Sequence, residues 1–320
     1  MARFAAALCL AAAGAAPSAL WHPPRHAAPW PGLSSGTERA AIAASLDLGP
    51  DLERGRSPAA ELAEHRRLSA ALEALQPQRR GVVDAYVISI ALDSDAVFGR
   101  EAREAGRVLA HRYDAAGRTL VLAGSDGAGP SALPGGSLHA LSLALARVAE
   151  LADPREDVLV LYVTTHGIPP GIVYHDGDEG YGLLTPARLA GLLDGLGLRN
   201  RLLILSACYS GAFVPALESQ STALFTAASA DRTSFGCAAD NDWTFFGDAM
   251  INRALRKPQP LVQASGQAVS LIAAWERSKG YKPSLPQVSI GGGVAAWLAP
   301  LEARMPREAT APVGRPAAGR

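Results

Sequence analysis

Two stretches of the chain share one pattern, an apolar run that ends in a reactive side chain. The first is 157–167, DVLVLYVTTHG, which ends in His166 and Gly167. The second is 201–212, RLLILSACYSGA, in which Cys208 follows the apolar residues. Nearly continuous apolar runs of this length are typical of strands that are covered on both faces of a parallel sheet. The pattern therefore places an imidazole and a thiol just beyond the carboxyl ends of two strands.

Strand-like and helix-like segments alternate through the rest of the chain. We expect strands at 82–92, 119–123, 158–164, 202–205 and 223–228, an edge strand at 286–290, and helices at 101–111, 138–151, 186–196, 245–255 and 263–279. Loops are expected at 93–100 and 168–184. This alternation predicts an α/β fold with a mostly parallel sheet of about six strands and helices on both faces. A short helical N-terminal segment, with helices at 37–48 and 58–75, precedes it.

The ends of the chain differ in composition from its middle. Residues 1–19 resemble a secretory signal peptide, because Arg3 precedes an apolar run that is too short to span a bilayer. An alanine-rich start that is merely apolar is the alternative. We interpret 20–80 as a linker and a helical accessory or pro-segment, 81–300 as the main domain, and 301–320 as a disordered tail. The chain is then exported, to a periplasm or the extracellular space, and has no stable membrane span after signal removal.

Composition narrows the partners and cofactors. The 48% of hydrophobic residues and 19% of charged residues fit a globular core, and the net charge of zero gives no basic surface for nucleic acid. The segment 174–180, YHDGDEG, has the composition of a cation-binding loop but no known ligand spacing. We therefore expect neither a metal nor another cofactor. Outside the signal segment only Cys208 and Cys237 remain, which excludes a disulfide scaffold and leaves Cys237 as a buried packing residue or the disulfide partner of Cys208.

The two reactive tips are expected to meet. Sites in parallel sheets form outside the carboxyl ends of the strands, and strands joined by one crossover are often neighbours about 4.8 Å apart. A Cys/His pair is the minimal apparatus of nucleophilic catalysis. The backbone N–H groups of Gly167 and Cys208 are candidates for an oxyanion hole, and a helix at 210–216 would favour a thiolate. Taken singly, each of the two side chains is more often a packing residue.

At these residues the sequence resembles the legumain-like cysteine peptidases of family C13, which share the caspase–haemoglobinase fold. The matching pieces are Thr165-His166-Gly167, Ser206-Ala207-Cys208-Tyr209-Ser210-Gly211, Thr226-Ala227-Ala228 with Thr233-Ser234-Phe235-Gly236-Cys237, and Phe245-Phe246-Gly247-Asp248. They span about 82–255. The resemblance implies that Cys208 is the nucleophile and His166 the general acid and base, with Gly167 at the oxyanion hole.

The resemblance also implies a substrate pocket for an Asn or Asp side chain. Its candidate residues are Arg100 and Asp248, and Ser234 would lie on the strip that pairs with the substrate backbone. A surface ion pair or a helix cap is the alternative for Arg100 and Asp248. The plant and animal enzymes carry an acid two residues before the cysteine, where this chain has Ser206, so the pocket lacks one of the family's polar groups.

Three functions follow from these observations. The first is an exported cysteine endopeptidase that cleaves a peptide or protein after Asn or Asp through a thioester at Cys208. The second is a transpeptidase or transamidase that uses the same thioester. The third is a non-catalytic α/β binding module in which Cys208 and His166 are relics.

Overall fold

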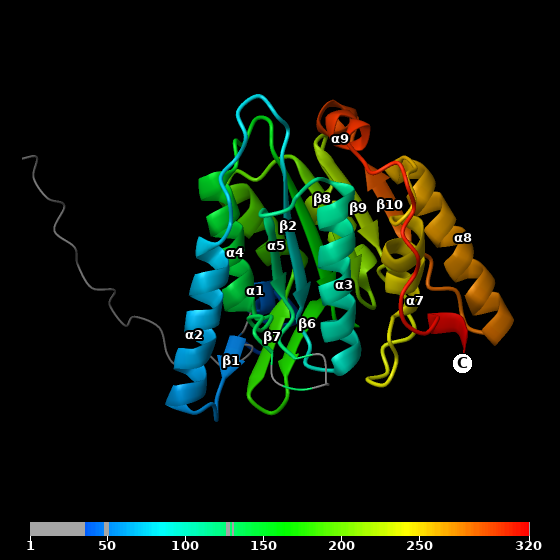
Figure 1. The fold of residues 1–320 in the computed structure, drawn as a ribbon. Coiled ribbons are helices and arrows are strands. Elements are labelled where there is room, and N and C mark those ends of the chain that lie inside the picture. Colours follow the sequence, from blue (N-terminus) through cyan, green and yellow to red (C-terminus); the bar gives the residue numbers. More distant parts are fainter. Residues whose placement is uncertain (1–35, 48–50, 126–128, 130, 320) are drawn as a thin grey trace, which may run out of the picture. The chain divides into compact units, whose positions relative to one another are not determined.

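The centre of the molecule is a six-stranded sheet with the strand order β10-β9-β8-β4-β2-β3 (Figure 1). The structure of the protein is a computed structural model, and it describes residues 36–47, 51–125, 129 and 131–319. The strands of this sheet are β2 (Ala85–Ala91), β3 (Thr119–Leu122), β4 (Val158–Thr164), β8 (Arg201–Ser206), β9 (Thr222–Thr226) and β10 (Gln287–Ile290). The predicted α/β class and the number of strands are confirmed. The sheet is mixed, since β10 runs antiparallel to β9 while the other pairs are parallel.

Helices lie between and beyond these strands. They are α1 (Arg39–Asp47), α2 (Pro58–Glu73), α3 (Ala96–Arg112), α4 (Leu138–Leu151), α5 (Pro186–Gly195), α6 (Val214–Leu217), α7 (Phe245–Gly247), α8 (Leu261–Lys279) and α9 (Val294–Ala303). Shorter elements are the 3₁₀ turns η1 (Ser210–Phe213) and η3 (Ala317–Gly319) and the π-helical η2 (Asp248–Ala254). Two helices begin at a side-chain cap, because Ser137 accepts a hydrogen bond from Ala140 N and Thr185 accepts one from Arg188 N.

Alternate residues of the strands feed two separate cores. Tyr162 and Ile204 belong to a cluster with α3, η2, α8 and α9, whereas Leu161 and Leu203 belong to a cluster with α2, α4 and α5. Figure 1 shows α2 and α4 on one side of the sheet and α3 and α8 on the other. The central strands β2, β4 and β8 are buried along their whole length, which explains why they read as continuous apolar runs.

The two predicted reactive tips end neighbouring strands. β4 and β8 are parallel partners, and the last pair in their register is Thr164 with Ser206. His166 and Cys208 each lie two residues beyond that pair. The expectation that the two strands are neighbours is confirmed.

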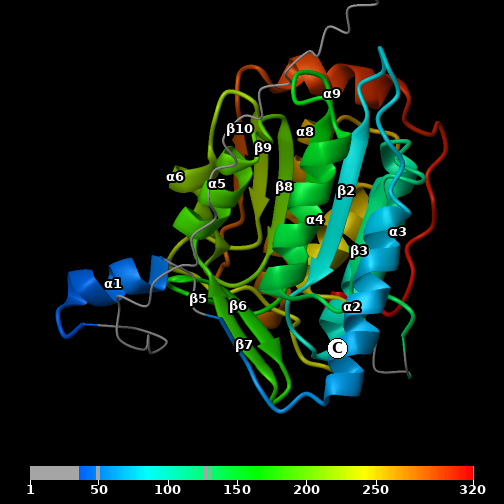
Figure 2. The same ribbon diagram turned by 90° about the vertical axis from the view of Figure 1, so that its left-hand side faces the viewer.

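The segment that was expected to be a loop at 168–184 is a β-hairpin. It forms a second sheet from β5 (Gly167–Ile168), β6 (Gly171–Asp176) and β7 (Gly180–Leu184), with the order β1-β7-β6-β5. Figure 2 places this hairpin beyond the carboxyl ends of the main strands. The loop prediction was wrong because polar residues and glycines fill the solvated side of the hairpin, while Ile172, Tyr174 and Leu184 are buried.

The N-terminal segment is joined to the main domain, without the expected boundary at 80. β1 (Asp51–Glu53) pairs with β7, and Arg56 forms ion pairs with Glu53, Asp176 and Glu179. Leu68 of α2 is buried in the core on that side of the sheet. The predicted signal peptide, 1–19, lies outside the described residues. None of the described helices is both long enough and apolar enough to cross a membrane.

The C-terminal tail follows a defined path, which differs from the disorder expected at 301–320. Val313 exchanges two hydrogen bonds with the side chain of Asn252, and Arg315 pairs with Asp242 through two nitrogen atoms. Ala317 N donates to Asp248 Oδ2. A Pro- and Arg-rich composition does not distinguish a disordered segment from one whose polar groups are held by a folded partner.

Candidate functional site

A small cavity lies at the carboxyl ends of β4 and β8 and contains both reactive side chains. Its lining residues come from the two strand tips and from the segment after β9: Thr165, His166, Ser206, Ala207, Cys208, Ser234, Phe235, Cys237 and Thr244. The structure therefore brings four of the sequence-predicted site residues together, namely His166, Ser206, Cys208 and Ser234.

The backbone turns sharply directly after the thiol. Tyr209 adopts a left-handed conformation with φ +57°, and its N–H donates to Arg232 O at 2.8 Å. Gly211 packs against the backbone of the segment after β9, where a Cβ atom would lie 2.6 Å from Ala230 N. The chain then continues as η1 and α6, so the helix considered at 210–216 forms as two short pieces. This turn holds Cys208 at the tip of β8.

Gly167 is required by the close approach of the two strand tips. A Cβ atom at this position would lie 1.9 Å from the carbonyl oxygen of Cys208. Any other residue would push the imidazole-bearing tip away from the thiol-bearing tip. The structure thus shows a steric reason why glycine is needed at position 167, in addition to the oxyanion role that was inferred from the sequence.

The thiol of Cys208 is partly buried against the segment after β9. Its sulfur accepts a hydrogen bond from Ser234 N at 3.2 Å, and it lies 3.6 Å from Ser234 O. Burial raises the pKa of the Cys208 thiol, and the N–H of Ser234 offsets only part of that effect. The expected helix N-terminus does not produce a stabilised thiolate. Burial therefore favours the protonated form of the sulfur.

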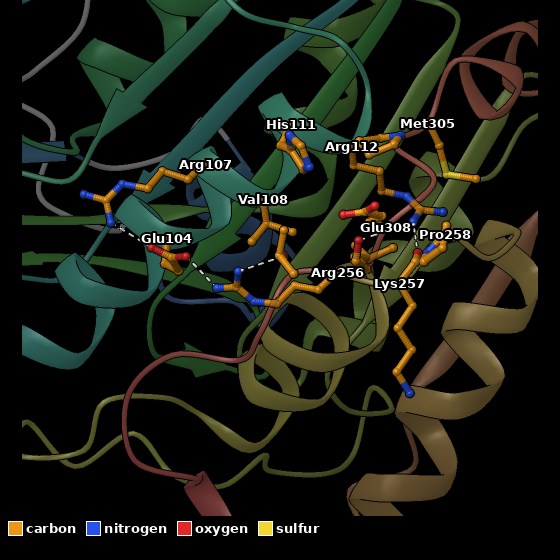
Figure 3. Close-up of a pocket in the computed structure, with 13 residues that line it drawn as sticks. Glu104, Arg107, Val108, His111, Arg112, Arg256, Lys257, Pro258, Met305 and Glu308 are labelled. Carbon is orange, nitrogen blue, oxygen red and sulfur yellow. Dashed lines mark hydrogen bonds and ion pairs between the residues drawn. The ribbon is translucent and has the colours of Figure 1, made fainter.

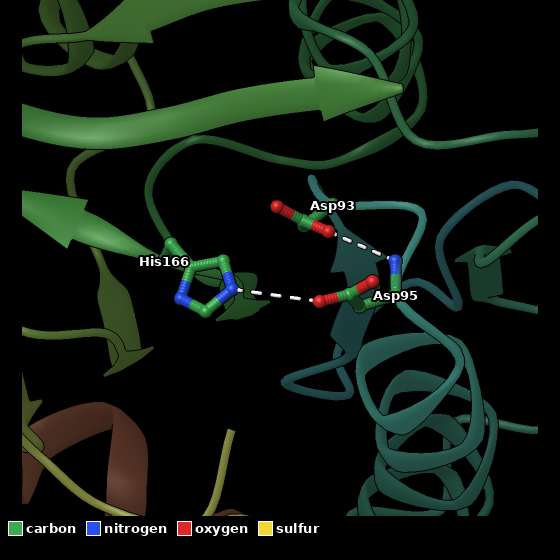
Figure 4. Close-up of side chains that lie close together, drawn as sticks. All are labelled: Asp93, Asp95 and His166. Carbon is green, nitrogen blue, oxygen red and sulfur yellow. Dashed lines mark hydrogen bonds and ion pairs between the residues drawn. The ribbon is translucent and has the colours of Figure 1, made fainter. Parts of the chain in front are cut away.

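The imidazole of His166 is more exposed and lies among acidic groups. Its side chain is 39% exposed and packs edge-on against Phe98, with ring centroids 5.0 Å apart. Nε2 lies 3.7 Å from Asp95 Oδ2, and Figure 4 shows the other ring nitrogen on the side away from Asp95. A hydrogen bond with Cys237 and the nearby charges of Asp93 and Asp95 raise the pKa of His166.

Cys237 packs partly buried against the hydrophobic cluster that contains Val97 and Phe98, and it is not a disulfide partner. It is half-buried, it lines the cavity, and both Cys237 and Cys208 are free thiols. Its interaction with His166 raises the pKa of that imidazole. The imidazole therefore has thiols of two cysteines within the same cavity.

Glu101 is buried beneath the Cys208 tip and was not predicted as a site residue. It is fully buried, and its Oε1 accepts hydrogen bonds from the hydroxyls of Tyr162, Thr164 and Ser206. Oε2 accepts the backbone N–H of Thr244 at 2.8 Å. Ser206, which stands where the family's plant and animal enzymes carry an acid, is thus bonded to an acid that comes from α3.

Two predicted substrate-binding residues do not line the cavity. Arg100 lies in α3, which begins at Ala96, so the loop expected at 93–100 is shorter than predicted. Its guanidinium donates to the carbonyls of Ala239 and Asn241. Asp248 is fully buried in η2, where its carboxylate bonds to Asn252, Arg253 and Ala317 N. Both side chains already have protein partners.

Asp93 and Asp95, which were not predicted from the sequence, lie just beyond the carboxyl end of a strand, as His166 and Cys208 do. Asp93 and Asp95 come directly after β2, so they lie at the same edge of the sheet as His166. Applying the strand-end rule to a third strand would have found them. Glu101 carries no such signal, because only the packing of α3 against β4 places it beneath Ser206.

Another cavity lies at the far end of α3 and is unrelated to the thiol. Figure 3 shows its basic and acidic lining, in which Glu104 is bonded to both Arg107 and Arg256. The guanidinium of Arg112 donates to the carbonyls of Lys257 and Gln259. These groups hold the segment after η2 against α3.

Comparison with known proteins agrees with the resemblance seen in the sequence. Residues 139–292 match the model of the Peptidase C13 family. The matched region contains His166, Cys208 and Ser234, whereas Arg100 and Glu101 precede it. No curated protein matches the chain.

Proposed function

Since the chain belongs to the Peptidase C13 family, which implies cysteine peptidase or related activity, we propose that it is a cysteine endopeptidase. The observation that carries the proposal is the shared cavity of His166, Cys208 and Ser234 at two neighbouring strand tips. The substrate is a peptide or protein. Export from the cytoplasm is part of the same proposal and rests on the composition of 1–19.

In the proposed reaction the sulfur of Cys208 attacks the carbonyl carbon of the scissile bond. His166 accepts the thiol proton and then gives it to the departing amine, which leaves a thioester. Water, deprotonated by His166, hydrolyses the thioester and restores the thiol. The N–H groups of Gly167 and Cys208 are the proposed donors to the oxyanion. Backbone groups of Ser234 lie beside the sulfur, where the substrate chain would run.

The electrostatics support proton transfer during the attack, as opposed to a resting ion pair. Burial raises the pKa of the Cys208 thiol, which favours a protonated sulfur before the attack. His166 must therefore remove the proton while the sulfur attacks, which is general-base catalysis.

Cleavage after Asn or Asp is the finer part of the proposal. Arg100 is the proposed cation that binds the carboxylate of an Asp substrate. To do so, its guanidinium would give up its hydrogen bonds to the carbonyls of Ala239 and Asn241 and bind the substrate carboxylate instead. We expect Arg100→Lys to lower kcat/KM for Asp substrates more than for Asn substrates, because the bidentate fork is lost. If kcat/KM fell equally whatever residue precedes the scissile bond, the role of Arg100 would be only to hold the loop that contains Ala239 and Asn241.

The direct test is the Cys208→Ala variant. It should lose turnover of Asn and Asp peptides and labelling by a thiol-directed acyloxymethyl ketone, and His166→Ala should lose turnover as well. His65→Ala, on the exposed face of α2, is the matched control. Turnover that persists in Cys208→Ala, or a label that maps to Cys237, would sink the proposal.

A further inference from the structure

Asp93, Asp95 and His166 form a cluster that the proposed reaction does not use in full. Each offers one ligand atom, and these atoms all lie within 4.8 Å of one another (Figure 4). Asp93 and Asp95 follow β2, and His166 follows the adjacent strand β4. Within the cluster, the imidazole of His166 presents its Nε2 atom to the carboxylate of Asp95.

The first unusual feature of the cluster is the carboxylate of Asp93. Its side chain is only 1% exposed, and Oδ1 accepts the N–H of Asp95. Oδ2 is buried without a hydrogen-bond partner among the described residues, and its nearest ionisable neighbour is His175 Nδ1 at 3.5 Å. A buried carboxylate oxygen without a donor is costly unless a cation meets it.

The second unusual feature is the orientation of Asp95. This residue is the N-cap of α3, where an Asp side chain normally accepts a hydrogen bond from the first turn of the helix. Here its side chain makes no capping bond, and Oδ2 is directed at Nε2 of His166 instead. A group that would stabilise the helix faces the cluster.

We propose that Asp93, Asp95 and His166 form a zinc site that switches off the catalytic imidazole. Carboxylate oxygen and imidazole nitrogen are both zinc ligands, and a zinc site with three protein ligands leaves the fourth position to water. Ligand atoms of a tetrahedral zinc ion lie about 3.4 Å apart, so the exposed side chains of Asp95 and His166 would close on the ion by a small movement. Asp93 also borders a cavity of about 370 Å³ that Ser94 and His175 line as well.

The inhibitory effect follows from the chemistry of imidazole. A zinc ion on Nε2 leaves the neutral ring with its one proton on the other nitrogen. That nitrogen then donates a hydrogen bond and has no lone pair to accept the proton of Cys208. The bound ion would therefore stop general-base catalysis without touching the thiol. This consequence rests on the proposed function, whereas the binding of zinc does not.

The binding test needs no substrate. The chain is freed of metal with a chelator and dialysed against zinc chloride, and bound zinc is counted per chain. We expect Asp93→Asn and Asp95→Asn each to lose one ion, with affinity lowered more than about 100-fold, since even groups that only orient ligands are worth 10- to 100-fold. Cys208→Ala, Asp178→Asn and His65→Ala should retain the ion. Circular dichroism checks that each variant folds, and Asp95, at 49% exposure, is the safer of the two.

Two outcomes would overturn the site whether or not the chain is a peptidase. One is an unmodified chain that binds no zinc, which would leave Asp93 and Asp95 as simple partners of a protonated imidazole. The other is an ion that is lost in Cys208→Ala and kept in Asp93→Asn, which would mark thiolate ligation. If the ion binds as expected, peptidase activity should fall with zinc and return with chelator, and activity that ignores a bound ion would overturn the switch alone.

Discussion

Two buried acids flank the candidate active site, and they are satisfied very differently. Glu101, beneath the Cys208 tip, accepts hydrogen bonds on both oxygens from three hydroxyls and one backbone N–H. Asp93, beside the His166 tip, accepts a hydrogen bond on one oxygen, whereas its other oxygen has no hydrogen bond among the described residues and lies 3.5 Å from His175 Nδ1. The difference shows that the hydrogen bonds of the buried acid on the thiol side are all formed, while a carboxylate oxygen on the imidazole side can still bind a cation.

Removing the satisfied acid should have the largest effect. Glu101→Ala leaves the hydroxyls of Tyr162, Thr164 and Ser206 and the N–H of Thr244 without an acceptor in a dry interior. Each such group costs about 1–3 kcal/mol, so we expect the free energy of unfolding to fall by at least about 3 kcal/mol. Urea denaturation measures it.

The matched control for this variant is Glu150→Ala, since that carboxylate is 67% exposed and, among the described residues, pairs with Arg147. Its change should stay within about 0.5 kcal/mol. If Glu101→Ala were as mild as the control, the network beneath Cys208 would not be the structural element that the contacts suggest.

The second prediction concerns the thiol above that network. Because burial raises the pKa of Cys208, the thiolate fraction is small at neutral pH and grows about tenfold for each pH unit. Alkylation by iodoacetamide, followed by mass spectrometry at Cys208, should therefore accelerate about tenfold per pH unit, which is about 30-fold from pH 7 to 8.5. A plateau below pH 8.5 would mean that the resting state holds a thiolate, and that the two sides of the cavity form an ion pair.

A smaller effect is expected for Ser206→Ala. Its hydroxyl donates to Glu101 and also contacts the hydroxyl of Thr244 at 3.2 Å, but Glu101 keeps its other donors. We expect a loss of about 1 kcal/mol in the free energy of unfolding. A loss above 2 kcal/mol would show that Ser206 is the centre of the network, a role here given to Glu101.

The smallest effect should come from the unsatisfied acid. In Asp93→Asn the amide oxygen can keep the bond from Asp95 N, and a buried charge that has only a long ion pair with His175 on its other oxygen disappears. We expect the free energy of unfolding of the zinc-free chain to rise, or to change by less than about 0.5 kcal/mol.

The contrast is Asp84→Asn, since Asp84 is fully buried with ion pairs to Arg79 and Arg118. That variant should be destabilised by more than about 1 kcal/mol. If Asp93→Asn were destabilised as strongly, Asp93 would be a structural acid like Glu101.

Sequence alone determined the framework and the two reactive tips. Apolar runs fully covered on both faces identify β2, β4 and β8 because a buried parallel strand has no solvated side. The rule that sites lie at the carboxyl ends of such strands then placed His166 and Cys208 at one edge. Their adjacency in register followed from a single crossover.

Only the tertiary structure decided what surrounds those tips. The hairpin at 168–184 looked like a loop because its polar side hides the buried one, and the tail reaches Asp248 through contacts between residues far apart in the chain. The acid beneath Ser206 comes from a helix about a hundred residues earlier, which no local pattern reveals. The ends of strands can be predicted from the local pattern of apolar residues. Whether a buried charge finds hydrogen-bond partners depends on how elements that are distant in the sequence pack together.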